Sequence, residues 1–554
     1  MLKKNRTYKC IGGNIMNRNK KIIIVGGGIS GLTTATSLAN RGANVLLVEK
    51  NDKCGGLVNS FTREGFIFDG GVRAVENAGM IKPMLEELEI DLTLYKSDVS
   101  IGVEDEVIGV ETEESVNDYE EMLKRLYPES EDDVERVINV IKKFDKYMNV
   151  LFGNDSPFFK DAKRDRSYYF TTFIPWIFRL IATGIAVLRM RMPVEDFLHK
   201  VMKNNSLIDI ISQHFFRGTP AFFAMSYFSL YTDYFYPMGG VGRIAEKLEE
   251  KLTAMGGEVI KNTEITGVHP GNKCITDLNG KQYNYDKLIW AADLKLLYRV
   301  IEKGGLPAKT LSKIDKEQER ILSKKGAESV FTVFMGVDQS PDTFKALSHG
   351  HFFYTPSRDG LGNLQREDLK LMLDNWENTS REEILDWLER FCSLNTYEIS
   401  IPVLNDPKAA PEGKTGIIAS FLFDYELIRR IHEDGWYESF KSAVEEKIIA
   451  VLDGSIYPGL KKNIIFKFSA SPLTLERWSG SSEGAIVGWS FEEPVPLDAG
   501  MLNMKDSVKT SMPDIYKAGQ WAVSPAGIPT CILTSKLAAD RVYKEVTANG
   551  EMNE

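Results

Sequence analysis

The pattern of apolar positions predicts a strand–helix–strand unit close to the start of the chain. Residues 21–25 read KIIIV, a β-branched run typical of a strand buried on both faces of a parallel sheet. Residues 32–42 follow with helical periodicity and end at a glycine, and residues 44–48 (NVLLV) form a second apolar run. This order of elements indicates an α/β fold of the Rossmann type.

A glycine turn joins the first predicted strand to the helix. In the segment GGGISG, Gly26 would make the tight turn, Gly28 would let the backbone approach a pyrophosphate, and Gly31 would let helix and strand pack closely. The free N–H groups of the helix start would face the phosphates. Glu49 ends the second strand eighteen residues after Gly31, where a carboxylate can bind both hydroxyls of an adenosine ribose. We therefore predict a dinucleotide site, and Glu49 disfavours the 2′-phosphate of NADP.

Length and composition narrow the class of protein. At 554 residues the chain is too long for one hydrophobic core, so we expect two or more domains. A net charge of −10 argues against nucleic acid as a partner, because proteins that bind its phosphates concentrate Lys and Arg. The five cysteines have no CxxC spacing and the six histidines no paired spacing, so we expect reduced thiols and no metal. Residues 1–19 lack the apolar stretch of a secretory signal, and we expect a flexible extension there.

Three further stretches resemble the FAD-binding parts of the amine oxidase and phytoene desaturase superfamily. Residues 54–71 hold a GG turn and a later DGG turn, and residues 235–269 hold YPMGG, an amphipathic helix, a glycine turn and a strand. Residues 514–541 hold a short strand, a Pro/Gly-rich turn and an apolar helix. The resemblance implies FAD as the cofactor, with a second helix N-terminus directed at the flavin.

The same resemblance implies a site and a division into domains. We expect a discontinuous Rossmann-like FAD-binding domain (20–85, 235–300 and 480–554) with an inserted α+β substrate-binding domain (86–234 and 301–479). The implied FAD-binding residues are Gly26, Gly28, Gly31, Glu49, Lys50, Gly55, Gly56, Leu57, Gly70, Gly71, Ile265, Gly519, Gln520, Gly527, Ile528 and Pro529.

Residues 400–417 and 469–489 are similar to segments of bacterial phytoene desaturases, carotenoid isomerases and retinol saturases. This branch implies hydride transfer between a flavin and a carbon of an apolar polyene or isoprenoid, giving desaturation, saturation, or isomerisation without net redox change. Three residues depart from the common pattern. Leu57 replaces an arginine, Gln520 replaces an acidic residue whose hydrogen bond an amide can still make, and the role of Lys536 is open.

Residues 171–188 are apolar apart from Arg179, with Pro175 near their start. A membrane-spanning helix needs about 20 apolar residues, so this segment is borderline. Three interpretations stay open: a buried core helix, a monotopic patch whose flanking arginines face lipid headgroups, and a true span. We expect a cytoplasmic protein, which would be peripheral on the inner face of the membrane under the second interpretation.

Residues 214–236 are unusually aromatic. They predict an aromatic core, a tunnel wall for a long, flat, hydrophobic small-molecule substrate, or both. The candidates for proton transfer are Arg73, Tyr231 and Asp233, with Tyr227 and His214 beside them, although each also fits a structural role. No catalytic triad or paired carboxylates demand another mechanism, and no motif identifies the electron partner.

Two other classes stay open. An amine oxidase-like or protoporphyrinogen oxidase-like flavoenzyme would act on an amine or a tetrapyrrole, and Cys531 would then be the residue to consider for covalent flavin attachment. A prenyl-lipid carrier similar to Rab escort proteins would share the fold without flavin chemistry. The acidic Glu49 and the two glycine-rich ends of the site favour retained FAD.

Overall fold

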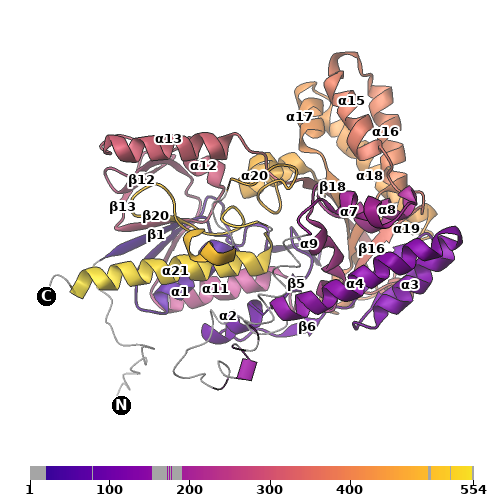
Figure 1. Cartoon of the computed structure of the whole chain (residues 1–554), viewed down its shortest axis with the longest axis horizontal. Helices are drawn as coiled ribbons and strands as arrows, with labels where there is room; N and C mark the ends of the chain where they lie inside the picture. The colour runs from indigo at the N-terminus through magenta and orange to yellow at the C-terminus, as the bar shows by residue number, and fades with distance from the viewer. Residues whose placement is uncertain are drawn as a thin grey trace.

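The computed structural model describes residues 20–77, 79–152, 190–496, 501–524 and 526–551, together with five residues between 167 and 176. The predicted extension 1–19 and most of the apolar segment 171–188 lie outside these residues. Figure 1 shows two parts side by side, one around the N-terminal strand and the C-terminal helix, the other around a larger sheet.

A five-stranded parallel sheet forms the centre of the first part, in the order β10-β2-β1-β14-β20. Residues Ile22, Ile23 and Ile24 of the central strand are fully buried, which explains why this strand is apolar at successive positions rather than at alternate ones. The family expectation of a Rossmann-like α/β fold is confirmed. The strands are β1 (Lys21–Val25), β2 (Asn44–Val48), β10 (Glu258–Ile260), β14 (Lys287–Trp290) and β20 (Ile515–Lys517).

Both faces of this sheet are covered. One core cluster joins alternate residues of β1 to three helices on one face, which Figure 1 shows running beside one another. The helices are α1 (Ile29–Ala39), α11 (Gly242–Ala254) and α21 (Ile528–Glu551). A second cluster covers the other face with α12 (Leu294–Arg299), α13 (Ala308–Leu322) and the three-stranded sheet of β11 (Ile265–His269), β12 (Cys274–Asp277) and β13 (Gln282–Asn284).

The second part contains a seven-stranded, largely antiparallel sheet in the order β19-β15-β18-β17-β16-β7-β8. Its strands are β7 (Val99–Val103), β8 (Glu106–Val110), β15 (Ser329–Val337), β16 (His351–Thr355), β17 (Tyr397–Ser400), β18 (Thr415–Phe423) and β19 (Ile464–Ala470). One core cluster packs it against α14 (Pro341–Lys345), α15 (Leu369–Asp374), α16 (Arg381–Leu394), α17 (Tyr425–Glu433), α18 (Tyr437–Gly454) and α19 (Leu460–Asn463).

A second helical layer lies against β7 and β8 and carries the aromatic segment. It consists of α3 (Ser115–Leu126), α4 (Glu131–Phe152), α7 (Val194–Val201), α8 (Asn205–Ser212), α9 (Ala221–Met225) and α10 (Tyr227–Tyr231). The sheet and its helices match the expected inserted α+β part, and the exact domain bounds remain our proposal.

Small elements connect the two parts. They are the hairpin β3 (Ser60–Arg63) and β4 (Phe66–Asp69), the sheet of β5 (Val75–Glu76), β9 (Tyr234–Pro237) and β6 (Leu94–Lys96), and the helices α2 (Ile81–Glu87) and α20 (Pro472–Ser479). In the antiparallel pair of β5 and β9, Glu76 lies directly opposite Tyr234, so the two side chains share one face.

Across the described ranges, no helix combines the length and apolar character needed to cross a membrane.

Candidate cofactor and substrate site

A single cavity of 1660 Å³ is lined by both parts of the molecule. Binding pockets for one small molecule usually measure about 300–1000 Å³. The cavity therefore has room for a dinucleotide and a second molecule. The glycine turns line one end of it, and the aromatic segment supplies much of the rest.

In the first glycine turn, each of the three predicted positions needs glycine for a different structural reason. Gly26 has a φ of +101°, which L side chains rarely adopt. A side chain on Gly31 would overlap the carbonyl oxygen of Gly26, so the helix can approach the strand this closely only at a glycine. Gly28 has ordinary extended angles, and its missing side chain would point into open space in the cavity. This open space is where the prediction places the pyrophosphate.

Glu49 is held in place by the turn that it faces. One carboxylate oxygen accepts a hydrogen bond from the backbone N–H of Gly27 (2.6 Å), and the other accepts one from that of Asn51 (2.9 Å). The side chain is only 7% exposed, yet it lines the cavity. Because each oxygen has a further lone pair, the carboxylate can still accept the two ribose hydroxyls.

The GG and DGG turns pack directly against the first turn and against each other. The N–H of Gly55 donates to the carbonyl of Gly27 (2.8 Å), which brings the GG turn beside the first. A side chain on Gly71 would overlap the carbonyl of Leu57, and one on Gly70 would overlap the side chain of Asn59. Glycine is thus required here so that three backbone segments can meet around the cavity.

Asp69 of the DGG turn has a structural role that the sequence did not reveal. Its fully buried carboxylate accepts hydrogen bonds from Ser60 Oγ (2.6 Å), Tyr236 Oη (2.8 Å) and the N–H of Val241 (3.0 Å). Burial raises its pKa although these bonds oppose the shift. Asp69 therefore ties the hairpin to the YPMGG stretch rather than facing the cavity.

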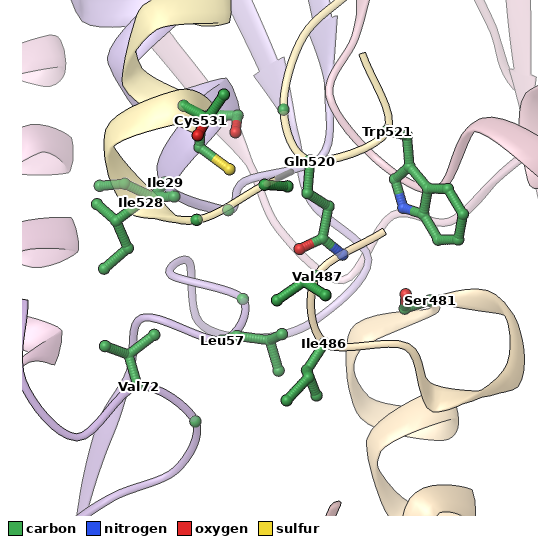
Figure 2. Close-up of a pocket in the computed structure, with 18 of the residues that line it drawn as sticks. Ile29, Leu57, Val72, Ser481, Ile486, Val487, Gln520, Trp521, Ile528 and Cys531 are labelled. Atoms are coloured by element: carbon green, nitrogen blue, oxygen red, sulfur yellow. The ribbon is translucent and has the colours of Figure 1, made fainter. Parts of the chain in front are cut away.

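The C-terminal turn closes the same end of the cavity. Gly519 donates its N–H to Thr534 (2.9 Å), and Ser535 donates to the carbonyl of Ser30 (2.9 Å). Cys531 in the first turn of α21 also hydrogen-bonds Ser30, so the starts of α21 and α1 lie together. Two helix N-termini with their positive dipole ends are thus directed at one region. Figure 2 shows Gln520, Ile528 and Cys531 around this region.

The departures from the family pattern can be located. Leu57 lines the cavity with Ile486 and Val487, so the wall here is apolar where many relatives carry an arginine, and Gln520 is directed toward Val487 (Figure 2). Lys536 lies outside the lining and forms a partly buried ion pair with Glu87 of α2. This structural role answers the question that the sequence left open.

Every predicted cofactor-binding residue lines the cavity except Gly31, whose task is helix packing. Lys50 lines it while its Nζ donates to the carbonyl of Arg477 (3.0 Å), and Ile265 lines it beside Thr263 and Glu264. Burial raises the pKa of the Cys531 thiol to about 11, so this group stays protonated near neutral pH and is a weak nucleophile.

Aromatic side chains of the predicted tunnel segment line the other half of the cavity. Their rings meet edge-on, as for Phe223 and Tyr227 with centroids 5.7 Å apart, and Phe353 of β16 extends the same wall. Such a wall suits a long, flat, apolar molecule. The residues of this segment that line the cavity are His214, Phe215, Phe216, Gly218, Pro220, Phe222, Phe223, Tyr227, Leu230 and Tyr234.

The proton-transfer candidates separate into two groups. Arg73, Tyr227 and His214 line the cavity, whereas Tyr231 and Asp233 do not. Tyr231 is buried behind Tyr227, with ring centroids 5.2 Å apart. Burial lowers the pKa of His214 to about 4, so its imidazole is neutral near pH 7.

The sequence analysis also missed several ionisable residues that line the cavity, and three of these lie in its aromatic half: Glu76, His351 and Glu398. His351 Nε2 lies 3.2 Å from Glu398 Oε1, and Arg73 lies close enough for its charge to act on Glu398. In the sequence, the only indication that Glu398 belongs to the site was its charge at a position between Tyr397 and Ile399. Within the described residues there is no group of three or more metal-binding side chains.

The geometry fits the implied FAD. Gly28 leaves open space beside a helix N-terminus, Glu49 presents a fixed carboxylate, and the start of α21 supplies a second helix end. When bound, FAD would supply two-electron redox chemistry.

The chain is similar to known flavin proteins along most of its length. The sequence pattern of the flavin-containing amine oxidoreductases matches residues 29–543. A chloroplastic prolycopene isomerase 2 of an Oncidium hybrid cultivar is 24% identical, covering 95% of this chain and 84% of its own length. A 4,4'-diapophytoene desaturase of Staphylococcus aureus is 21% identical (95% and 99% covered), and an all-trans-retinol 13,14-reductase of Danio rerio 20% (90% and 82%).

Solved structures share the fold. An oxidoreductase from Methanosarcina mazei superposes with a TM-score of 0.57 at 14% identity, covering 95% of this chain and 100% of its own.

Proposed function

Because the chain belongs to the flavin-containing amine oxidoreductase family and is therefore an FAD-dependent oxidoreductase, we propose that it acts on carbon–carbon bonds of an apolar polyene or isoprenoid. The observation that carries this proposal is the continuity of the cavity. The glycine turns of the cofactor site and the aromatic wall belong to the same space. A substrate lying along that wall can therefore reach the cofactor without crossing a barrier of side chains.

Different residues of this chain would bind the cofactor and the substrate at different positions along the cavity. Gly28, Glu49 and the start of α21 would hold the dinucleotide, and the aromatic wall would orient the substrate and exclude water. The apolar surface around Leu57 extends this environment to the cofactor end. Most of the side chains along this wall are aromatic or aliphatic, which suits the hydrocarbon skeleton of a polyene.

The relatives support the substrate class and leave three reactions to choose from. Their names describe an isomerase, a desaturase and a reductase, each acting on a polyene or retinoid. We propose that this chain catalyses one of these reactions. As part of the same proposal, its substrate comes from a membrane that residues 171–188 contact peripherally.

Anaerobic stopped-flow spectroscopy tests the proposal. We expect a polyene, a retinoid or an unsaturated isoprenoid to reduce the oxidised flavin or to oxidise the reduced flavin, with the product identified by chromatography. If amines reduce the flavin and polyenes do not change it, the amine oxidase alternative replaces ours. A protein that holds no FAD and extracts prenyl lipids would instead be a carrier.

Replacing Leu230 by aspartate is expected to weaken polyene binding about 100-fold, equivalent to about 2.7 kcal/mol. Leu230 of α10 lines the cavity, and a charge without a partner in an apolar wall is costly to desolvate. Quenching of protein fluorescence by the polyene measures the affinity. Leu371→Asp is the matched control, because Leu371 is 66% exposed and lies outside the cavity. Equal affinities in the two variants would contradict the proposed substrate wall.

A further inference from the structure

A cluster of ionisable side chains lies inside the cavity, between the DGG turn and the aromatic wall. Its six members all line the cavity. They come from the strands β5, β9, β16 and β17, from the helix α10 and from the loop before β5. They are Arg73, Glu76, Tyr227, Tyr234, His351 and Glu398. Carboxyl groups enclosed by aromatic rings need a partner or a function, because burying them without one is costly.

Two carboxyl groups of the cluster experience opposite environments. Burial tends to raise the pKa of Glu398, but His351, whose Nε2 lies 3.2 Å away, and the charge of Arg73 outweigh it, so the net pKa of Glu398 is lowered. Arg73 is itself fixed by bonds from Nη1 to the carbonyls of Asp69 and Gly71, both 2.6 Å. Glu398 therefore stays ionised near neutral pH.

Among the residues that the structure describes, no cationic side chain forms an ion pair with Glu76. Burial raises its pKa to about 7, and the negative charges of Asp233 and Glu398 act in the same direction, while its backbone N–H and the hydroxyl of Tyr234 act against it. Two carboxyl groups whose environments push their pKa values apart are typical of acid–base catalysis. A group that titrates near neutral pH can both hold and release a proton under working conditions.

Tyr234 and Tyr227 connect Glu76 to the aromatic wall. Tyr234 lies opposite Glu76 in the pair of β5 and β9 and hydrogen-bonds its carboxyl group. The hydroxyls of Tyr227 and Tyr234 are 3.0 Å apart. Burial raises the pKa of both phenols, so both keep their protons and can pass one along the chain of hydrogen bonds.

We propose that Glu76 moves a proton to or from the substrate carbon skeleton, with Tyr234 and Tyr227 relaying it and with Glu398, His351 and Arg73 fixing the local charge. The inference rests on the proposed function. Desaturation breaks two C–H bonds and forms one C=C bond. One hydrogen leaves with its electron pair to the flavin oxidant, and the other leaves as the proton that Glu76 accepts. Saturation is the reverse, with a reduced flavin as the reductant.

The direction of the reaction then sets the sign of its pH dependence. Desaturation needs the Glu76 carboxylate, so its rate rises as the pH increases through about 7. Saturation needs the carboxylic acid, so its rate falls across the same interval. Glu398 and His214 titrate below this interval and the two phenols above it.

Glu76→Gln in the FAD-loaded protein is the central test. Removing a general acid or base typically lowers the rate of the chemical step about 10²–10⁴-fold, and we expect a loss in this range. FAD content and polyene affinity should not change, because the amide keeps the shape of the side chain. The rate change centred near pH 7 should disappear. If the reaction is a saturation, solvent deuterium should enter the carbon skeleton when the parent protein works in deuterated water, and much less of it should enter with the variant.

Asp145→Asn is the matched control. Burial also raises the pKa of Asp145 to about 7, but this residue lies outside the lining of the cavity. Its variant should keep the parent rate and pH profile. Infrared difference spectra between about pH 5 and 9 give a readout that needs no turnover. The parent should show titrating carboxyl bands that include those of Glu76 and Asp145, and each variant should lose the one band that belongs to its substituted residue.

The outcomes separate this inference from the proposed function. If Glu76→Gln leaves turnover and solvent labelling unchanged, the inference is overturned and the proposed function still stands. The same holds if the variant loses polyene affinity alone, because the cluster would then bind a polar end of the substrate. If no polyene reacts with the parent flavin, the function falls. If Glu76→Gln does not fold, Tyr234→Phe must lower the rate and the solvent labelling, and a variant that keeps both overturns the relay.

Discussion

Replacing Gly28 by valine is expected to abolish FAD retention while leaving the protein folded. The backbone of Gly28 has φ −67° and ψ 179°, which valine adopts without strain, and the new side chain would enter open space. That space is the predicted pyrophosphate position beside the start of α1. We expect at least about 100-fold weaker binding, equivalent to about 2.7 kcal/mol. The flavin absorbance of the purified protein and a titration of the apoprotein with FAD measure it.

Gly304→Val is the control for this experiment. Gly304 also has an allowed backbone and open space around its Cβ position, but it lies outside the cavity. The Gly304→Val variant should bind FAD as tightly as the parent protein. Gly31 is unsuitable for the same comparison, because any side chain there would strike the Gly26 carbonyl and disturb the fold itself. A yellow Gly28→Val protein with full flavin content would mean that the dinucleotide site was misplaced.

Replacing Glu49 by alanine is expected to have the second largest effect. The substitution removes the carboxylate predicted to bind the ribose and leaves the N–H groups of Gly27 and Asn51 without their acceptors. Hydrogen bonds to a charged group contribute about 1.5–3 kcal/mol each, so both FAD binding and the stability of the apoprotein should fall. FAD titration and the thermal midpoint of the apoprotein measure the two effects separately.

Glu49→Gln completes the second experiment. Glutamine keeps the length of the side chain and one carbonyl oxygen, so it can accept from one of the two N–H groups and bind the ribose in part. Its loss of affinity should lie between those of the parent and the alanine variant. Full FAD occupancy in Glu49→Ala would show that the carboxylate only supports the turn.

Some parts of the fold and site could be predicted because their causes are local. A strand buried on both faces must be apolar throughout, so KIIIV identified β1, and the interval from Gly31 to Glu49 is set by one helix and one strand. The C-terminal turn was found from its Pro/Gly pattern because it too is a continuous segment. The structure brings these segments together around one cavity.

Other parts depended on packing between distant segments. The aromatic segment indicated a wall, but its helical packing turns Tyr227 and Leu230 to the cavity and buries Tyr231 behind them. The interpretation of residues 171–188 remains a prediction, because most of them lie outside the described structure.

The sequence by itself determined the class of fold, the cofactor turn and the acidic residue that faces it, since each depends on neighbours within one strand–helix–strand unit. Only the tertiary structure decided which ionisable groups share the cavity. Glu76, His351 and Glu398 lie on three strands far apart in the chain, and the pKa of each carboxyl group is set by neighbours that meet only after the sheets have paired. The interaction between two charges depends on the distance between them in the folded protein, and the spacing of the residues along the chain does not give that distance.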